Sequence, residues 1–203
     1  MKIAVIGASG SVGSRVVAEA VRRGHDVVAI ARHTERIVPR ERTQVVAGDI
    51  ADPGVLAGLL AGADVVVSSV RFVAFDIDRL LDALVMAGRS RLVMVGGAGS
   101  LRTASGGLLM DSSNFPEAAR AEARAGAEKL ESLRAQSRVK WTFISPSALF
   151  APGERTGRYR TGVDTLLVDS EGRSRISQED YAMALLDEIE HQRHTGQRFT
   201  VGY

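Results

Sequence analysis

Short apolar runs alternate with longer amphipathic segments along most of the chain. The runs are rich in valine and isoleucine and predict strands at 2–6, 26–31, 43–48, 64–70, 91–97, 139–146 and 197–203. The segments between them repeat apolar residues at helical spacing and predict helices at 11–24, 53–62, 76–88, 115–136 and 177–192, the last with Ser177 as its N-cap. Continuously apolar strands separated by helices indicate a parallel sheet that is covered on both faces.

This alternation predicts an α/β fold, a doubly wound parallel sheet with helices on both faces. The length of 203 residues and the lack of a linker favour a single domain, 1–203. The segment 150–176 has no helical period and is rich in glycine, arginine and aspartate. Since connections of that length inside a domain are more often functional than idle, we expect a small C-terminal substrate region there.

Composition narrows the class of protein. Apolar residues make up 45% of the chain, and no run reaches the roughly 18 residues of a membrane span. The chain begins directly with a strand rather than a secretory leader, and it has no cysteine for disulfides, thiolate nucleophiles or zinc sites. The net charge of +2 comes from scattered arginines without a basic block. We therefore expect a cytoplasmic monomer or homodimer that binds a small-molecule substrate, and neither nucleic acid nor membrane.

Three glycines connect the first predicted strand to the first predicted helix, within VIGASGSVGSRVV at 5–17. In this setting Gly7 permits a tight turn, Gly10 lets a phosphate approach the backbone, and Gly13 lets the helix pack close to the sheet. The amides at the helix start then face an anion. We therefore predict that a dinucleotide pyrophosphate binds at Gly7, Ala8, Ser9, Gly10, Ser11, Val12 and Gly13.

The end of the second predicted strand bears on the choice between NADP and NAD. NAD sites usually carry an acidic residue there to bind the ribose hydroxyls. This chain reads AIARHTER, with Arg32 at the strand tip and Arg36 behind it. A guanidinium can bind a 2′-phosphate in bidentate fashion, so NADP is favoured and NAD remains possible.

These features resemble the atypical branch of the short-chain dehydrogenase/reductase superfamily. The resemblance is carried by GASGSVG at 7–13, AR after the second strand, GDI at 48–50 and ISQEDYA at 176–182, and it covers essentially the whole chain. The chain is similar to NmrA-like proteins, to biliverdin reductase B and flavin reductase-like proteins, and to small epimerase/dehydratase-like proteins. The resemblance implies a Rossmann fold with further cofactor contacts at Asp49, Ile50, Ser68, Ser69, Val70, Gly97 and Pro146.

One departure from the superfamily constrains the chemistry. Its typical enzymes use Tyr-x-x-x-Lys on the helix before the sixth strand, and the tyrosine moves a proton to or from the substrate oxygen. Here that helix reads ARAGAEKLE, with Ala125 four residues before Lys129. The loss favours hydride transfer to an acceptor that takes its proton from solvent, such as a flavin, a quinone or a tetrapyrrole. Ser100, Ser147 and Tyr159 are the substitute catalytic candidates.

Two loops and one histidine pair are the remaining candidate functional features of the sequence. GERTGRYR at 153–160 either clamps an anion through Arg155, Arg158 and Arg160 or is a solvated loop, and the loop 100–116 is a candidate lid. His191 and His194 form an H-x-x-H pair far from the glycine turn, and we expect no metal there.

Three functions remain open from the sequence. The first is an NADP(H)-binding oxidoreductase that reduces a conjugated acceptor by direct hydride transfer. The second is an NmrA-like redox-sensing regulatory protein that binds the dinucleotide without turnover, which the missing tyrosine favours. The third is an epimerase/dehydratase-like enzyme, for whose substrate lobe this chain leaves little room. Whether the protein is an enzyme thus stays undecided at this stage.

Overall fold

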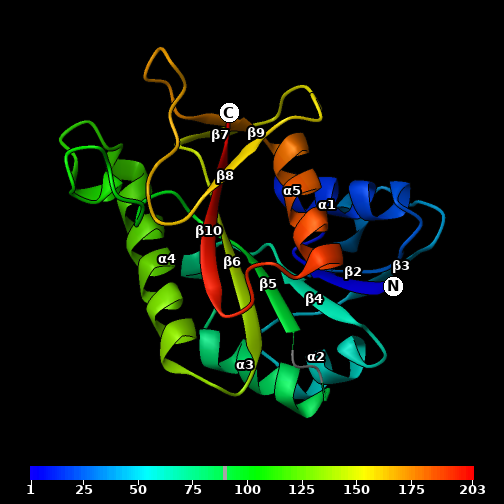
Figure 1. The fold of residues 1–203 in the computed structure, drawn as a ribbon. Coiled ribbons are helices and arrows are strands. Elements are labelled where there is room, and N and C mark those ends of the chain that lie inside the picture. Colours follow the sequence, from blue (N-terminus) through cyan, green and yellow to red (C-terminus); the bar gives the residue numbers. More distant parts are fainter. Residues whose placement is uncertain (89–90) are drawn as a thin grey trace.

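The computed structural model describes residues 1–88 and 91–203 (Figure 1). Its centre is an eight-stranded sheet with the order β3-β2-β1-β4-β5-β6-β10-β8. The strands of this sheet are β1 (Lys2–Ile6), β2 (Asp26–Ala31), β3 (Thr43–Ala47), β4 (Val65–Ser68), β5 (Arg91–Val95), β6 (Lys140–Pro146), β8 (Arg160–Gly162) and β10 (Gln197–Gly202). The helices are α1 (Ser11–Arg22), α2 (Pro53–Leu60), α3 (Ile77–Met86), α4 (Glu117–Ala135) and α5 (Gln178–His191).

Every predicted strand and helix is confirmed to within a few residues at its ends. The segment 150–176 differs from its prediction, because it contains β8 and a separate two-stranded sheet of β7 (Leu149–Ala151) and β9 (Arg175–Ser177). β8 pairs antiparallel with β10 at the sheet edge, whereas the other neighbours in the large sheet pair parallel. The sheet is thus mostly parallel. Strands of three residues are too short to show a hydrophobic period, which is why the pattern did not indicate them.

Helices cover both faces of the sheet, as the doubly wound pattern predicts. One apolar cluster joins α1 and α5 to one face, through residues such as Val16 and Leu185. A second cluster joins α2, α3 and α4 to the other face, through residues such as Leu56, Leu84 and Leu130. Figure 1 shows α1 beside α5, with α3 and α4 across the sheet from them. Among the described residues, no helix is long and apolar enough to cross a membrane.

The order of the strands reverses between β1 and β4. From β1 the chain winds outward through β2 and β3, and it then returns to β4 and winds the other way through β5 and β6. In open α/β sheets, ligands bind in the crevice that this reversal leaves at the carboxyl ends of the strands. The residues after β1 and β4 are therefore the first place to search for a site.

Candidate functional site

Three adjoining cavities follow the carboxyl ends of the strands. The first, called here the β1–β2 cavity, has a volume of about 200 Å³ and lies between Gly7, Arg32 and Asp49. The second, the junction cavity, has about 350 Å³ and shares Ser69 and Val70 with the first. The third, the α4 cavity, has about 550 Å³ and shares Phe72, Gly96 and Glu122 with the junction cavity. The shared walls make one continuous crevice across the point where the strand order reverses.

The glycine turn fits tightly against the end of β4. Gly7 has a φ of +83°, and a Cβ atom there would lie 2.3 Å from the carbonyl oxygen of Ser69. A Cβ atom on Gly13 would lie 2.2 Å from the carbonyl oxygen of Gly7. Both positions therefore require glycine, for a close approach and, at Gly7, for the left-handed backbone as well. The turn holds the start of α1 against the crevice.

The N-terminus of α1 is left open toward this crevice. α2, α3 and α5 are capped by the side chains of Asp52, Asp76 and Ser177, which accept hydrogen bonds from backbone N–H groups of the first turn. α1 has Gly10 at the same position, no side-chain cap and no acidic residue in its first turn. Its free N–H groups and the positive end of its dipole thus form a site for an anion.

The β1–β2 cavity is cationic at its outer end. Arg32, His33 and Arg36 all line it and are exposed. Arg32 and Arg36 form no ion pair with any residue that the structure describes. Guanidinium groups that are free of partners can bind a phosphate on the ligand side of the cavity.

Most of the predicted cofactor residues line the crevice. These are Gly7, Ser9, Gly10, Ser11, Val12, Arg32, Asp49, Ile50, Ser69, Val70, Gly97 and Pro146. Ala8, Gly13 and Ser68 do not line it. Ala8 is buried in the core, Gly13 packs on the backbone of Gly7, and the Ser68 hydroxyl is buried without a hydrogen-bond partner in the described structure. These three residues pack beneath the glycine turn rather than facing the crevice.

The α4 cavity is mainly apolar and aromatic. Its walls include Phe72, Leu109, Phe115, Leu149 and Phe150. Aromatic walls and a volume of this size suit a ring system. The polar side chains that line it are Ser112, Asn114, Glu122 and Ser147. The Ser147 hydroxyl is fully buried and donates a hydrogen bond to the carbonyl oxygen of Val201 over 3.1 Å.

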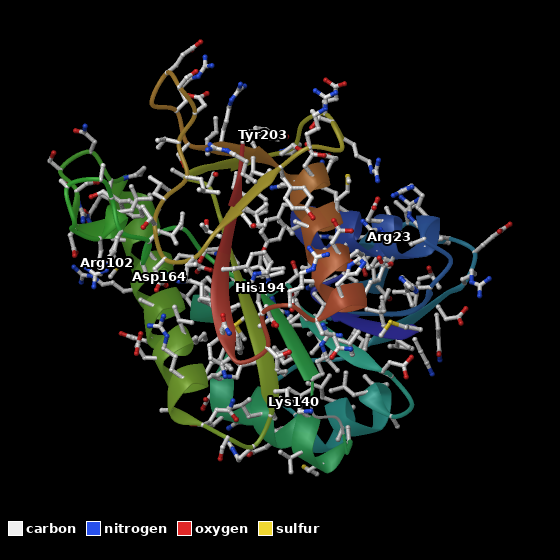
Figure 2. All side chains as sticks on the ribbon, in the orientation of Figure 1. Arg23, Arg102, Lys140, Asp164, His194 and Tyr203 are labelled. Carbon is white, nitrogen blue, oxygen red and sulfur yellow. The ribbon has the colours of Figure 1, made fainter. Side chains whose placement is uncertain are left out.

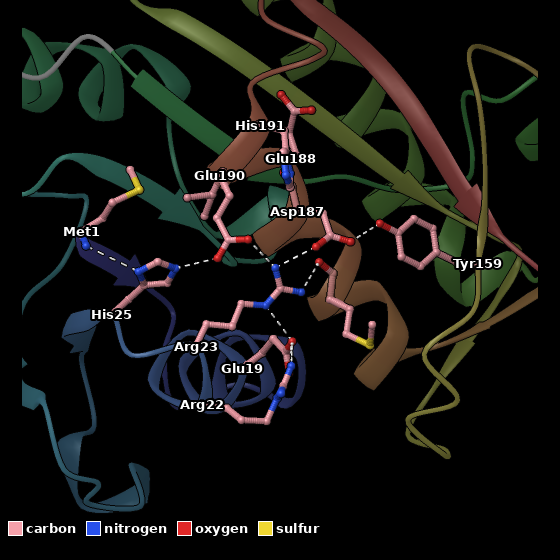
Figure 3. A network of polar contacts seen from close by, with 12 residues as sticks. Met1, Glu19, Arg22, Arg23, His25, Tyr159, Asp187, Glu188, Glu190 and His191 are labelled. Atoms are coloured by element: carbon pink, nitrogen blue, oxygen red, sulfur yellow. Dashed lines mark hydrogen bonds and ion pairs between the residues drawn. The ribbon is translucent and has the colours of Figure 1, made fainter.

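The structure places Tyr159 and Ser100, two of the three catalytic candidates, outside the three cavities. The Tyr159 hydroxyl points toward α5 and donates a hydrogen bond to Asp187 (Figure 3). Burial and this contact with a carboxylate raise the pKa of Tyr159 above its ordinary value. The Ser100 hydroxyl accepts a hydrogen bond from Arg198 over 2.9 Å. Both hydroxyls are therefore committed to other parts of the fold.

The arginines of segment 153–160 do not line the crevice either. Arg155 donates hydrogen bonds to the buried carboxylate of Glu19 over 3.1 Å, and Arg160 donates to the carbonyl oxygen of Val168 over 2.7 Å. Arg158 is exposed. Of the two interpretations left open for this segment, these contacts favour a role in the fold over an anion clamp, because they occupy Arg155 and Arg160.

The other predicted loop, 100–116, does reach the α4 cavity. It supplies Leu109, Ser112, Asn114 and Phe115 to the wall. Its base is tied to the 160–170 region, where the Arg102 N–H donates to the carbonyl oxygen of Asp164 over 2.8 Å. Figure 2 shows Arg102 and Asp164 side by side. Whether this loop opens and closes stays a prediction.

The segment 70–75 lines all three cavities, and sequence reasoning identified Val70 but missed the rest of it. Val70 and Phe75 line the β1–β2 cavity, and Phe72 lines the other two. α4 holds the segment in place through Glu122, Gly126 and Lys129. The Glu122 carboxylate accepts a hydrogen bond from the Phe72 N–H over 2.6 Å, and a Cβ atom on Gly126 would lie 2.8 Å from the Phe72 ring. The Lys129 ammonium lies 4.9 Å from the centre of the Phe75 ring.

The spacing of these three residues on α4 is the signal that could have pointed to the contact. Glu122, Gly126 and Lys129 follow one another at i, i+4 and i+7, and therefore share one helix face. A carboxylate, a glycine and an ammonium on one face of an alanine-rich helix indicate a close partner rather than solvent. The pattern does not, however, name that partner.

The two histidines of the H-x-x-H pair make separate contacts. His191 Nδ1 lies 2.8 Å from the carbonyl oxygen of Asp187, and His194 Nδ1 lies 2.8 Å from the Glu188 carboxylate. Within residues 1–88 and 91–203, no group of three or more histidine, cysteine, aspartate or glutamate side chains is placed to hold a metal ion.

The chain matches a known protein family and several solved structures over most or all of its length. A family described as NAD(P)H-binding matches residues 7–192. A protein from Burkholderia pseudomallei, proposed to be exported, is 44% identical with a TM-score of 0.90, and both chains are covered fully. A proposed epimerase from Bacteroides thetaiotaomicron is 43% identical with a TM-score of 0.91, over 100% of this chain and 96% of that one. A proposed NADH-flavin reductase from Streptococcus pneumoniae is 34% identical with a TM-score of 0.82, over 100% and 99%.

These matches confirm the resemblance to NAD(P)-binding proteins with a Rossmann-like fold. They do not decide between NADP and NAD, and they name no single activity for the group. Since one relative is proposed to be exported, the cytoplasmic location expected from the sequence stays a prediction. By the match over residues 7–192 and the shared fold, the chain belongs to the NAD(P)H-binding family.

Proposed function

We propose that the protein is an NADP(H)-dependent oxidoreductase that reduces a flat, conjugated acceptor by direct hydride transfer. The observation that carries the proposal is the continuous crevice, which runs from the free arginines of the β1–β2 cavity to the aromatic walls of the α4 cavity. One end of the crevice fits the phosphates of a dinucleotide, and the other end fits a ring system.

The residues present fit a dinucleotide. The open N-terminus of α1 would hold the pyrophosphate, because its N–H groups lack a side-chain cap. Arg32 and Arg36 would hold a 2′-phosphate, and Asp49 and Ile50 would lie against the adenosine. The reactive end would then extend past Val70 into the junction cavity. When bound, the reduced nicotinamide supplies a hydride, so that the acceptor gains two electrons and a hydrogen, takes one proton from water, and leaves the cofactor oxidised.

The side chains around the acceptor favour a substrate that needs no protein acid. Among the described residues, no tyrosine, histidine, lysine or cysteine lines the junction cavity or the α4 cavity. The buried Ser147 hydroxyl already donates its hydrogen to Val201. An alcohol or simple ketone needs a proton donor beside the hydride path, whereas a quinone or flavin ring spreads the charge and accepts its proton from water. The name of the Streptococcus pneumoniae relative supports this class of acceptor.

The test is NADPH oxidation by the purified protein with a panel of quinones and flavins, alongside calorimetry with NADPH and NADH. We expect turnover with at least one acceptor and tighter binding of NADPH than of NADH. Arg32→Ala should weaken NADPH binding by about tenfold or more and leave NADH binding nearly unchanged, since only NADPH carries the 2′-phosphate. Tight NADPH binding without oxidation by any acceptor would overturn the enzymatic proposal.

The alternative is an NmrA-like sensor that binds the dinucleotide without turnover. The lack of a tyrosine, histidine, lysine or cysteine among the described residues of the junction cavity and the α4 cavity also fits this alternative. A sensor should bind NADP⁺ and NADPH with different affinities, which calorimetry measures. The Bacteroides thetaiotaomicron relative brings in a third candidate, an epimerase. That activity needs a group that removes and returns a substrate proton, and Glu122 is the one carboxylate among the described residues that line the α4 cavity.

A further inference from the structure

The two ends of the crevice have opposite electrostatic character. The β1–β2 cavity is lined by Arg32 and Arg36, with His33 beside them and Asp49 as the acidic residue. In the α4 cavity, Glu122 is the charged side chain among the described lining residues, and the rest are apolar or uncharged polar groups. A negative charge on an acceptor would thus meet a carboxylate and no lining cation.

Glu122 is held in place at the boundary between the α4 cavity and the junction cavity. Its carboxylate accepts hydrogen bonds from the N–H groups of Phe72, over 2.6 Å, and Val73, over 3.4 Å. Its side chain is 27% exposed, so the carboxylate is partly shielded from water. The cation nearest to it, Arg71, lies 3.6 Å away and is 75% exposed, and an ion pair so open to solvent is weak. The negative charge of Glu122 is therefore only partly balanced.

Arg120 lies near the cavity but does not serve it. Its guanidinium donates to the carbonyl oxygen of Met110 over 2.6 Å and pairs with Glu117 over 2.5 Å. It lies 5.8 Å from the centre of the Phe115 ring, whose residue forms part of the cavity wall. Glu117 and Met110 do not line the cavity, and neither does Arg120 itself, so its two bonded nitrogens point to groups other than an anion inside.

The start of α4 also opens on the cavity, through Pro116 and Ala119. A free helix N-terminus would favour an anion. Here Glu117 places a carboxylate in the first turn, and the Ala119 N–H already donates to the carbonyl oxygen of Pro116. The helix start is therefore not built as an anion site, unlike the start of α1.

We propose that the α4 cavity selects aromatic acceptors that carry no negative charge, and that Glu122 is the residue that determines this selection. The substrate class is a neutral planar ring such as an unsubstituted quinone, and it excludes acceptors with a sulfonate, carboxylate or phosphate that must enter the cavity. An anion would leave water for an apolar wall and approach a fixed carboxylate, and both effects oppose binding. The acceptor role of the cavity rests on the proposed function, whereas the charge selection is a property of binding alone.

Binding of two matched fluorescent probes tests the selection without turnover. N-phenyl-1-naphthylamine is neutral, and 8-anilino-1-naphthalenesulfonate has the same rings with one negative charge. Both are titrated into the protein with NADP⁺ in excess, which keeps the sulfonate out of the cationic β1–β2 cavity. We expect the neutral probe to bind at least about tenfold more tightly. Ala119→Trp, which places an indole in the cavity, should weaken binding of the neutral probe and so locate it.

The ratio of the dissociation constants of the anionic and the neutral probe, measured in variants, tests whether Glu122 causes the charge selection. Glu122→Gln should reduce the ratio by about threefold or more, because it removes the charge and keeps the side-chain shape. Glu117→Gln is the matched control, since it removes a carboxylate of the same helix that is 86% exposed and does not line the cavity. The proposal is wrong if the sulfonate binds as tightly as the neutral probe, if the neutral probe does not bind, or if both variants change the ratio equally.

Turnover with 1,4-naphthoquinone and its 2-sulfonate separates this proposal from the proposed function. Equal kcat/KM values for the two quinones would overturn the charge selection and leave the reductase function standing. Selective binding of the neutral probe without turnover of either quinone would support the charge selection and overturn the reductase function.

Discussion

Replacing Glu19 by glutamine should destabilise the protein by an amount that depends on pH. Glu19 lies on α1, and its side chain is only 5% exposed. It accepts hydrogen bonds from Arg22 over 2.6 Å, from Arg23 over 2.9 Å and from Arg155 over 3.1 Å. Figure 3 shows how Arg23 then bridges from Glu19 to Asp187 and Glu190 on α5. Through these contacts, Glu19 connects α1 to α5 and to the segment after β7.

The size of the effect follows from the pKa of Glu19. Burial alone would raise this pKa, but the hydrogen bonds from Arg22, Arg155 and Arg23 outweigh it and lower the pKa from 4.5 to about 2. By linkage, a shift of this size corresponds to about 3 kcal/mol of folding free energy. Because folding lowers the pKa, this stabilisation is present above pH 4.5 and is lost as the pH falls toward 2. Protonation in the unfolded chain removes about 1.4 kcal/mol of it by roughly pH 3.5.

Urea unfolding at about pH 7 and pH 3.5 measures both quantities, because glutamine does not titrate. We expect Glu19→Gln to be less stable than the parent by about 3 kcal/mol at neutral pH, and the gap to shrink by about 1.4 kcal/mol at the lower pH. Glu41→Gln is the control, since Glu41 is exposed and its side chain has no partner among the described residues. An equal gap at both pH values would refute the ionic role of Glu19.

Three further substitutions test which residues shape the crevice and which lie outside it. Gly7→Ala should weaken dinucleotide binding by about tenfold or more in calorimetry, because its Cβ would lie 2.3 Å from the Ser69 carbonyl oxygen at a φ of +83°; unchanged affinity would contradict the close approach. Gly126→Val should displace the Phe72 ring, which a Cβ atom there would approach to 2.8 Å, and lower the affinity of the neutral probe for the α4 cavity. An unchanged probe affinity would show that Phe72 does not shape that wall. Tyr159→Phe should cost about 1 kcal/mol of stability in urea unfolding and leave kcat unchanged, since the hydroxyl contacts Asp187 outside the cavities; a large loss of kcat would return Tyr159 to the site.

The parts of the fold that the sequence predicts are those whose signal is local. Ile3 and Val5 face one apolar cluster while Ala4 and Ile6 face the other, so a strand buried on both faces reads as an unbroken apolar run. The signal of Gly7, Gly10 and Gly13 is also local, because the three glycines lie within seven residues, although Gly7 is required by its approach to Ser69 at the end of β4. The ends of the strands can also be located from the apolar runs. Arg32 and Val70 come at such ends, and both line the crevice as expected.

The parts that the sequence does not predict depend on contacts between distant segments. Phe72 and Glu122 are 50 residues apart, and the Glu122 carboxylate accepts a hydrogen bond from the Phe72 backbone N–H. Tyr159 lies in a loop that sequence reasoning places near the site, yet its direction is set by Asp187, which is 28 residues away. Ser100 likewise follows a strand end, but the buried Arg198 binds its hydroxyl. Chain position indicates which residues approach the crevice, whereas the partner of each side chain decides which of them face it.

The segment 70–75 gives a structural reason to expect that the two ends of the crevice act together. Val70 and Phe75 line the β1–β2 cavity, and Phe72, between them, lines the α4 cavity. The same short segment is fixed by one face of α4, through Glu122 at Phe72 and Lys129 at Phe75. A ligand that moves the segment at one end must therefore change the wall at the other. Binding of the dinucleotide should then alter acceptor affinity, and linkage requires the acceptor to alter dinucleotide affinity by the same factor.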